Sequence, residues 1–463
     1  MRTETRTEHT TEPTAQRPGH RRDLAAAGAG ILLVTTAVLV GHAIENADHT
    51  LYVRWAPLLA TWYPHVGPGT VAAPAVAVAV IAYGPVLAGR LRWRTLLLGC
   101  YAASLAWVFS LALIDGWGRG IAARLTTKHE YLRVIGRFDD IGAALQGFNE
   151  HILIGPPGNW PAHVAGHPPG ATLTFVLLDR VGLGGGAWAG VWCIVTGASA
   201  AVAALVAVRA LGDEQTARRA APFIVLAPVA VWAGTSADGY FTAVAAWSVT
   251  LLALAATRTV RSPAAAALGA GLLYGLVCYL SYGLTLIAVL LLAVLVLTRT
   301  ARPLALFVLG ASAVPAAFAL AGFNWWQAYH LLVERYYQGA GGLRPYSYWV
   351  WANFACTAIA VGPATLAGLR RTAEGVPAAV RTLRTGTATS PQRLVLFVSA
   401  AFLALLAADL SGMSKAETER IWQPFILWLL PATALLPVQH RRGWLAAQAV
   451  VALTVNHVFW TGW

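Results

Sequence analysis

The side chains best suited to chemistry in this chain are acids and histidines gathered in one polar stretch, residues 115–169. It holds five of the 20 acidic residues and four of the 12 histidines: Asp115, Glu130, Asp139, Asp140, Glu150, His129, His151, His163 and His167. Carboxylates and imidazoles are the groups that most often move protons in enzymes. Because apolar segments flank the stretch on both sides, this pattern predicts a reactive site in one loop of a largely apolar protein.

Three acids are the candidates for catalysis. Asp115 lies where an apolar segment ends, and Glu130 follows in His129-Glu130-Tyr131. Asp238 stands alone in a short turn between two apolar segments, where a carboxylate is costly unless it faces a wet cavity. We predict Glu130, Asp115 and Asp238 as catalytic residues, with a first-loop acid as the base. The alternative for Asp115 is an ordinary interfacial acid.

The histidines and the paired aspartates of the stretch are candidates for substrate binding. His167 precedes two prolines, whose fixed φ angles hold the imidazole in place. We predict that His167, His163, Asp139 and Asp140 bind substrate. The alternatives are that Pro168-Pro169 only starts a helix and that Asp139-Asp140 only caps the amphipathic segment 141–153.

Cations near the end of the chain predict a phosphate site. Lys415 and Arg420 come just before an apolar segment, and a guanidinium can bind phosphate through two hydrogen bonds. The alternative is a salt-bridged interfacial loop. Arg335 and Tyr336 belong to an aromatic segment, residues 323–349, which is typical of a membrane interface. We predict that these two side chains also contact substrate.

Composition places the chain in a membrane. Of 463 residues, 57% are hydrophobic and 11% are charged, and the mean hydropathy is +0.59. Such a composition excludes a soluble globular protein. Apolar segments of about 20 residues can cross a bilayer as helices. We predict an all-α polytopic protein with about thirteen spans: 24–44, 72–89, 95–114, 187–208, 220–236, 240–256, 263–279, 283–298, 303–322, 349–368, 393–409, 423–437 and 443–460.

The net charge of +13 is explained by topology. With a cytoplasmic N-terminus, 22 of the 33 basic residues and 7 of the 20 acids fall on the inner side, leaving 11 basic residues and 13 acids outside. This is the distribution that the positive-inside rule describes. We therefore predict no nucleic-acid partner and a cell-membrane protein whose active site is extracytoplasmic.

The predicted organisation is a disordered cytoplasmic arm, residues 1–22, and one transmembrane domain, residues 23–463. Within it we expect a large extracytoplasmic loop over 115–186, with a juxtamembrane helix over 170–183 lying at the outer interface. Residues 371–392 are predicted to form a flexible cytoplasmic loop. The four single cysteines have no metal-binding spacing.

These features resemble the GT-C superfamily of membrane glycosyltransferases, and above all its branch of protein O-mannosyltransferases and bacterial aminoarabinose transferases. The resemblance rests on the acids of the first loop, the His-Pro-Pro turn at 167–169 and the later acid Asp238. It covers residues 95–260. The adjacent Asp-Glu pair usual at the front of that loop is absent here. Heavy use of Ala, Arg, Gly and Trp is also similar to actinobacterial proteins.

The resemblance implies an inverting hexosyl- or pentosyltransferase. It would move a sugar from a polyprenyl-phosphate-linked donor to an extracytoplasmic glycan, lipid or protein acceptor, with a first-loop acid as base. Glu130 is favoured slightly over Asp115, because its Glu-Tyr context is nearer the family pattern, and Asp238 would have a supporting role. No cofactor is assigned, a divalent cation (Mg or Mn) stays open, and no metal ligands are named. The other readings are a lipid or polymer transporter and a non-catalytic GT-C-like binding protein. No internal repeat of the kind common in transporters is evident.

Overall fold

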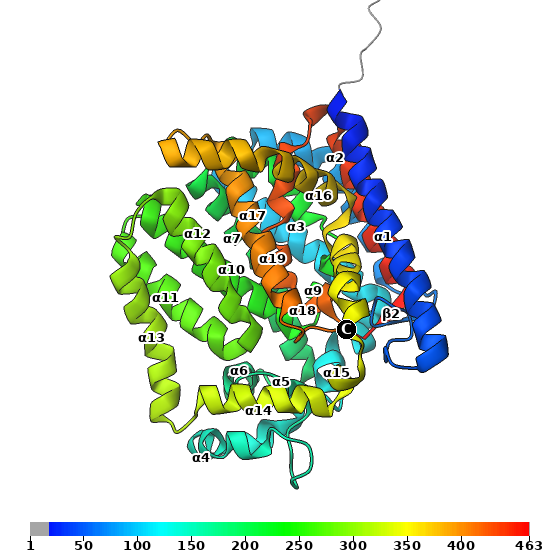
Figure 1. Cartoon of the computed structure of the whole chain (residues 1–463), viewed down its shortest axis with the longest axis vertical. Coiled ribbons are helices and arrows are strands. Elements are labelled where there is room, and N and C mark those ends of the chain that lie inside the picture. Colours follow the sequence, from blue (N-terminus) through cyan, green and yellow to red (C-terminus); the bar gives the residue numbers. More distant parts are fainter. Residues whose placement is uncertain (1–17, 463) are drawn as a thin grey trace, which may run out of the picture.

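Upright helices packed side by side form the body of the protein, and shorter helices lie across both of its ends (Figure 1). The computed structural model describes residues 18–462. One antiparallel pair of short strands, β1 (Ala60–Trp62) and β2 (Phe459–Thr461), joins the first connecting segment to the C-terminal one. All other elements of residues 18–462 are helices, so the predicted all-α class is confirmed.

Eight helices among residues 18–462 are long and apolar enough to cross a membrane. They are α1 (Pro18–Asp48), α2 (Gly69–Arg90), α3 (Trp93–Ala112), α7 (Gly186–Leu211), α10 (Ala237–Thr257), α11 (Pro263–Leu280), α16 (Tyr346–Thr385) and α17 (Ser390–Leu410). Each covers one predicted span. The chain is a multi-pass helical membrane protein.

Of the other five predicted spans, four are short or broken helices and the fifth is an 18-residue helix that is less apolar, so the count of thirteen is not confirmed. They correspond to α8 (Glu214–Val225) with α9 (Ala230–Ala233), η6 (Tyr282–Ile287) with α12 (Ala288–Thr298), α13 (Leu304–Leu320), α19 (Gln423–Ile426) with η7 (Leu430–Leu435), and α20 (Arg441–Val458). Pro228 and Pro431 stand at two of the interruptions, since proline lacks the N–H that a helix needs. After α13 the chain bends by 80° into α14 (Trp325–Gln338).

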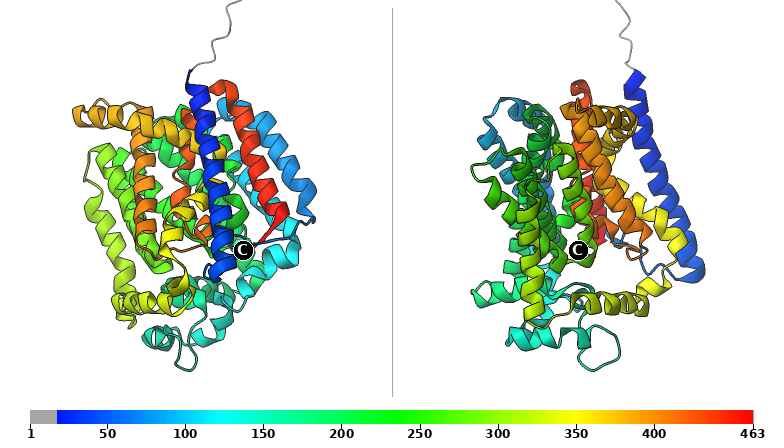
Figure 2. Two further views of the ribbon diagram at one scale, coloured as in Figure 1. Left: turned by 45° about the vertical axis from the view of Figure 1, so that its right-hand side comes forward. Right: turned by 60° about the vertical axis from the view of Figure 1, so that its left-hand side comes forward.

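Short helices gather at the end of the bundle opposite the N-terminus of α1 (Figures 1 and 2). Most come from the predicted large loop: η1 (Leu113–Asp115), η2 (Gly118–Ala122), η3 (Arg124–Thr126), η4 (Tyr131–Phe138), α4 (Ile141–Gln146), η5 (Phe148–His151), α5 (Ala162–Gly166) and α6 (Pro169–Arg180). α14 and α15 (Ala340–Leu343) lie beside them. Helix α6 packs on η4 and α11, while its predicted place at the membrane interface stays a prediction.

Two predicted flexible segments are partly helical. Helix α1 begins at Pro18, so the last residues of the predicted arm are ordered, and the rest of the arm lies outside the described residues. Helix α16 continues to Thr385 after a kink at Gly362, where φ is +74° and Pro363 follows. The prediction of a flexible loop over 371–392 is therefore wrong for 371–385. Arg371 connects this half of α16 to α1, because its Nη2 lies 2.6 Å from Oδ2 of Asp23 and forms an ion pair with it.

Close glycine contacts fix the packing around α10. A Cβ atom at Gly271 of α11 would lie 2.0 Å from the carbonyl oxygen of Phe307, so α11 and α13 approach closely only because glycine stands there. Helix α10 in turn packs against both α7 and α11. The N-terminus of α10, which carries Asp238, is therefore held by a rigid set of helices.

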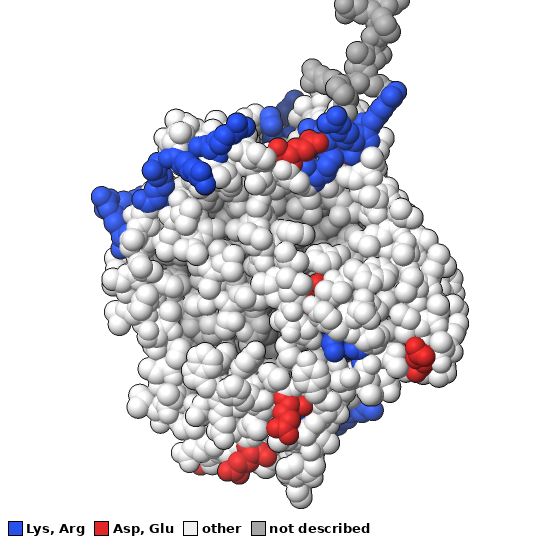
Figure 3. Space-filling view, viewed as in Figure 1, with Lys and Arg blue, Asp and Glu red and all other residues white. Residues whose placement is uncertain are grey.

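Charge divides the molecule into two ends. Lys and Arg side chains crowd the end where α1 begins, whereas Asp and Glu lie mainly toward the opposite end (Figure 3). The band between them is almost free of visible charge. This is the arrangement expected of a protein with one basic and one acidic membrane face.

Candidate active site

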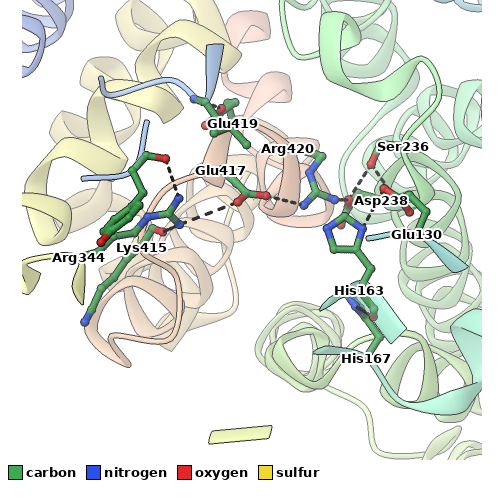
Figure 4. A network of polar contacts seen from close by, with 12 residues as sticks. Glu130, His163, His167, Ser236, Asp238, Arg344, Lys415, Glu417, Glu419 and Arg420 are labelled. Atoms are coloured by element: carbon green, nitrogen blue, oxygen red, sulfur yellow. Dashed lines mark hydrogen bonds and ion pairs between the residues drawn. The ribbon is translucent and has the colours of Figure 1, made fainter. Parts of the chain in front are cut away.

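Three segments that are far apart in sequence meet near the acidic end. They are the start of α10 with Asp238, the connection between α17 and α19 with the short helix α18 (Thr418–Ile421), and the loop that carries η4 and α5 (Figure 4). Five of their side chains form what we call the Arg420 network: Glu130, His163, Asp238, Glu417 and Arg420. The structure thus brings together Glu130, His163, Asp238 and Arg420, four of the residues predicted from sequence.

Arg420 joins two of these segments. Its Nη1 donates to Asp238 Oδ2, and its Nη2 donates to Glu417 Oε2 at 2.9 Å. Arg420 is only 5% exposed. Burial alone lowers the pKa of Arg420, but the nearby carboxylates of Asp238, Glu417 and Glu130 outweigh it and raise the pKa above its ordinary value. The network therefore keeps a permanent buried cation among three carboxylates.

Asp238 is fixed by the start of its own helix. The hydroxyl of Ser236, the N-cap residue of α10, donates to Asp238 Oδ2 at 2.7 Å and accepts from the Asp238 backbone N–H at 3.1 Å. Serine is among the residues preferred at this position. A carboxylate in the first turn of a helix also interacts favourably with the helix dipole. Asp238 is thereby a rigid partner for Arg420, which suits the supporting role predicted for it.

Glu130 uses only one of its two carboxylate oxygens within the Arg420 network. Its side chain is 1% exposed, and its Oε1 lies 2.9 Å from His163 Nδ1. Its Oε2 is buried and has no hydrogen-bond partner among residues 18–462. Glu130 stands immediately before η4, and His163 lies in α5, so one loop supplies both groups. A carboxylate held at one oxygen and unengaged at the other can accept a proton.

His167 lies at the turn between α5 and α6, as the Pro-Pro motif predicted. Its Nδ1 donates to the carbonyl oxygen of His163 at 2.7 Å, and its ring meets Tyr131 edge to face at 5.7 Å. Burial lowers the pKa of His167 to about 4, so the ring is neutral at physiological pH. With Nδ1 donating, Nε2 is the acceptor nitrogen. Such a ring can accept a hydroxyl hydrogen bond.

Lys415 and Arg344 lie on the side of Glu417 away from Arg420 (Figure 4), and Tyr336 contacts Lys415. Lys415 Nζ donates to the Gly341 carbonyl at 2.8 Å, and Tyr336 Oη accepts from the Lys415 backbone N–H at 3.1 Å. Arg344 Nη1 donates to the Lys415 carbonyl at 2.7 Å and lies 3.9 Å from Glu417 Oε1. The predicted cation Lys415 is thus near the network without being bonded to it.

Asp115 belongs to a separate cluster. Its Oδ1 pairs with His65 Nε2 at 2.6 Å, while its Oδ2 accepts from Arg124 Nη2 at 2.8 Å. Arg124 also donates to the carbonyl oxygen of Thr461, so the cluster joins η1 and η3 to the C-terminal strand β2. Both carboxylate oxygens of Asp115 are therefore engaged, whereas Glu130 has one oxygen without a partner in the described part of the chain.

Asp139, Asp140 and Arg335 lie outside the network. Asp140 caps α4 by accepting from the Ala143 N–H at 3.0 Å, which is the capping alternative that the sequence left open. Both aspartates are exposed and line a shallow surface hollow next to Trp160. Arg335 donates to the Trp160 carbonyl at 3.3 Å. The prediction that Asp139, Asp140 and Arg335 contact substrate stays a prediction, and any such contact would lie outside the Arg420 network.

Sequence reasoning did not select Glu417, Ser236 or Arg344 as site residues. The spacing of Glu417 and Arg420, three residues apart in a helical turn, is a signal that could have found the first. Ser236 shows the N-cap pattern, a small hydroxyl residue directly before a helix with an acid in its first turn. No sequence signal links Arg344 with Glu417.

Glu419 is a further buried acid near the site. It is 0% exposed, its Oε1 accepts from the Leu59 N–H at 3.2 Å, and its Oε2 has no hydrogen-bond partner among the described residues. Burial raises its pKa from 4.5 to about 7. The folded protein therefore binds this proton more tightly than the unfolded chain does. The resulting stability is present below pH 4.5 and is lost as the pH rises through about 7.

We expect Glu419→Gln to remove this pH dependence. At pH 8 the variant should be more stable than the parent by up to about 3 kcal/mol, while near pH 4.5 the two should be alike. The measurement is thermal unfolding across this pH range, with Glu334→Gln, an exposed acid on α14, as control. A parent protein whose stability does not fall between pH 4.5 and 8 would contradict the expectation.

The acids, histidines and cysteines of the described residues are the candidates for metal binding. Within residues 18–462, no group of three or more His, Cys, Asp and Glu side chains is arranged to hold a metal ion. The acids of the Arg420 network face Arg420 and His163 instead. These residues do not fit a divalent cation in their present arrangement, and the steps derived below use protein side chains alone.

Comparison with known proteins adds a likeness of overall shape. No family profile matches the chain, and no curated protein matches it in sequence. One similar solved structure is the oligosaccharyltransferase of Archaeoglobus fulgidus with Zn and sulfate, at 14% identity and a TM-score of 0.46 over 77% of this chain and 53% of that one. Another is AglB of the same organism with an inhibitory peptide and a dolichol-phosphate, at 12% identity and 0.49 over 79% and 56%. The chain spans little more than half the length of these proteins.

Proposed function

We propose that this chain is a membrane glycosyltransferase of the GT-C type, which moves a sugar from a polyprenyl-phosphate-linked donor to an extracytoplasmic acceptor. The observation that carries the proposal is the pairing of two buried groups in the Arg420 network. Glu130 has an unengaged carboxylate oxygen, and Arg420 is a permanent cation. A base for a hydroxyl and a cation for a phosphate are what this transfer needs.

In the proposed reaction an acceptor hydroxyl attacks the anomeric carbon of the donor. Glu130 Oε2 takes the hydroxyl proton, while His163 holds Oε1 and so fixes the carboxylate. The bond between the anomeric carbon and the phosphate oxygen breaks, and its electron pair leaves with the polyprenyl phosphate. Arg420 interacts with the leaving phosphate, Asp238 keeps Arg420 in position, and the neutral His167 accepts a substrate hydrogen bond. Attack from the face opposite the phosphate inverts the anomeric centre.

The proposed acceptor is a glycan, lipid or protein of the cell envelope on the outer side of the membrane. Charge distribution supports this orientation, since α18 and α5, which carry Arg420 and His163, lie in the half of the molecule away from the basic end (Figures 1 and 3). Under the positive-inside rule the basic end is cytoplasmic. The N-terminus of α1 would then be inside.

Topology can be tested with single cysteines at Asn159 and Thr389, both exposed positions. In a chain whose four native cysteines are replaced, an impermeant thiol reagent applied to intact cells should label position 159 and leave 389 unlabelled. Permeabilised cells serve as the control, since both positions should then react. Labelling of 389 alone in intact cells would reverse the proposed orientation.

The function is tested by incubating the purified protein with a panel of polyprenyl-phosphate sugars and candidate acceptors. We expect release of polyprenyl phosphate with one hexosyl or pentosyl donor, and an inverted anomeric configuration in the product. Repeating the assay with and without EDTA and added Mg or Mn tests the cofactor. Tight donor binding without release for every acceptor would favour a non-catalytic binding protein instead.

A further inference from the structure

Glu417 has no role in the proposed transfer, yet it is paired with Arg420, the cation that would bind the phosphate of the donor. Its Oε2 accepts from Arg420 Nη2 at 2.9 Å, and Asp238 takes Nη1 of the same guanidinium. Arg420 thus faces two carboxylates, with Glu130 close enough to influence its pKa. Three acids and one arginine give this cluster a formal charge of −2. A phosphate brought to Arg420 would meet strong repulsion unless one carboxylate withdrew.

Of the carboxylates paired with Arg420, Glu417 is the one built to move. Asp238 is held by Ser236 at the start of α10, and its side chain is 7% exposed, against 23% for Glu417. Glu417 lies on the connection between α17 and α18. Its φ is +64°, and that of Ala416 is +74°. Residues other than glycine seldom adopt this left-handed conformation, and strained turns of this kind occur at sites that switch between two arrangements.

A second cation, Arg344, lies close to the other carboxylate oxygen of Glu417. Arg344 Nη1 lies 3.9 Å from Glu417 Oε1, on the side away from Arg420 (Figure 4). Backbone carbonyls of Leu51 and Lys415 hold the Arg344 guanidinium in place. A rotation of the Glu417 side chain would exchange one arginine for the other, so the carboxylate would stay paired in both positions.

We propose that Glu417 is a gate for the phosphate of the lipid donor: it pairs with Arg420 when the site is empty and passes to Arg344 when phosphate binds. This inference rests on the proposed function. Glu417 then acts as a positioning residue that keeps Arg420 oriented in the empty site. It prevents weakly bound anions from pairing with Arg420, and the phosphate of the donor displaces it. The negative charge that Glu417 takes away from Arg420 is then replaced by the negative charge of the phosphate.

The test is the affinity of the purified protein for farnesyl phosphate, with farnesol as the matched ligand that lacks the phosphate. Glu417→Gln removes the competing charge, so farnesyl phosphate should bind about tenfold more tightly than to the parent, while farnesol binding should not change. Arg344→Gln removes the receiving cation and should weaken farnesyl phosphate binding. Glu334→Gln, an exposed acid on α14, is the control and should match the parent.

The outcomes separate the gate from the function. A parent protein that binds farnesyl phosphate no better than farnesol would overturn the proposed donor site itself. A parent that prefers the phosphate, together with a folded Glu417→Gln variant of equal or weaker affinity, would overturn the gate alone. Should Glu417→Gln fail to fold, Glu417→Asn also removes the charge and tolerates a left-handed backbone, and the same gain in affinity is expected of it.

Discussion

Glu130→Gln should abolish sugar transfer and leave donor binding largely intact. The amide keeps the size of the side chain but cannot accept the acceptor's proton, and loss of a positioned base typically slows a reaction by ~10²–10⁴-fold. Glu130 Oε2 is buried without a hydrogen-bond partner in the described part of the chain. Glu419 and Asp409 also have such an oxygen, but Glu130 is the one of these three acids that belongs to the Arg420 network. The measurements are the rate of polyprenyl phosphate release and, separately, the affinity for the donor.

Two further variants make this result specific. Glu150→Gln changes an exposed acid of the same loop and should transfer sugar at the parental rate. Asp115→Asn breaks the pair with Arg124 and should lower the melting temperature more than it lowers the rate of the folded enzyme, since both oxygens of Asp115 are engaged. Near-parental transfer by Glu130→Gln would remove Glu130 as the base. Loss of transfer in folded Asp115→Asn would return that role to Asp115.

Much of the fold could be predicted because apolar segments of bilayer length have few other ways to fold. The eight long helices match eight predicted spans. The five remaining spans are not confirmed, and most of these segments contain a break or a bend that average hydropathy does not register. Pro228 separates α8 from α9, and Gly322, with φ of +91°, marks the bend between α13 and α14. Such breaks depend on one or two residues, whereas the predictions were based on composition over some 20.

The candidate site was only partly predictable, for a different reason. Acids isolated in apolar surroundings, such as Asp238, stand out in a sequence because burying them is costly. Their pairing with a particular cation is not visible in the sequence. Arg420 was a candidate for phosphate binding, but it is 182 residues from Asp238, and Arg344 is one cation in a segment rich in aromatic residues. The resemblance favoured Glu130 only slightly over Asp115 as the base, and the sequence could not show that both oxygens of Asp115 are engaged. Pairing across such separations is set by helix packing, which single-sequence patterns do not encode.

Arg420→Gln should cost more stability than any other single change in the network. It leaves Asp238 and Glu417 without their buried cation, and removing one partner of a buried ion pair typically costs about 3–5 kcal/mol. Arg420→Lys keeps the positive charge but should weaken donor binding, because lysine lacks the planar fork with which a guanidinium binds phosphate. Because the guanidinium bonds two carboxylates through different nitrogens, a lysine cannot reproduce both contacts, and we expect it to lower stability as well.

A double-variant cycle makes this expectation quantitative. If Arg420 and Asp238 are directly coupled, Asp238→Asn should recover part of the stability lost in Arg420→Gln, because it removes one of the carboxylates left unpaired. The coupling between contacting charged residues is commonly about 0.5–3 kcal/mol. Thermal unfolding of the parent, both single variants and the double variant in lipid nanodiscs measures it, with Arg133→Gln, an exposed cation on η4, as control. Strictly additive losses would mean that the two residues stabilise the protein independently, and the network would then not be the unit that holds α10 to α18.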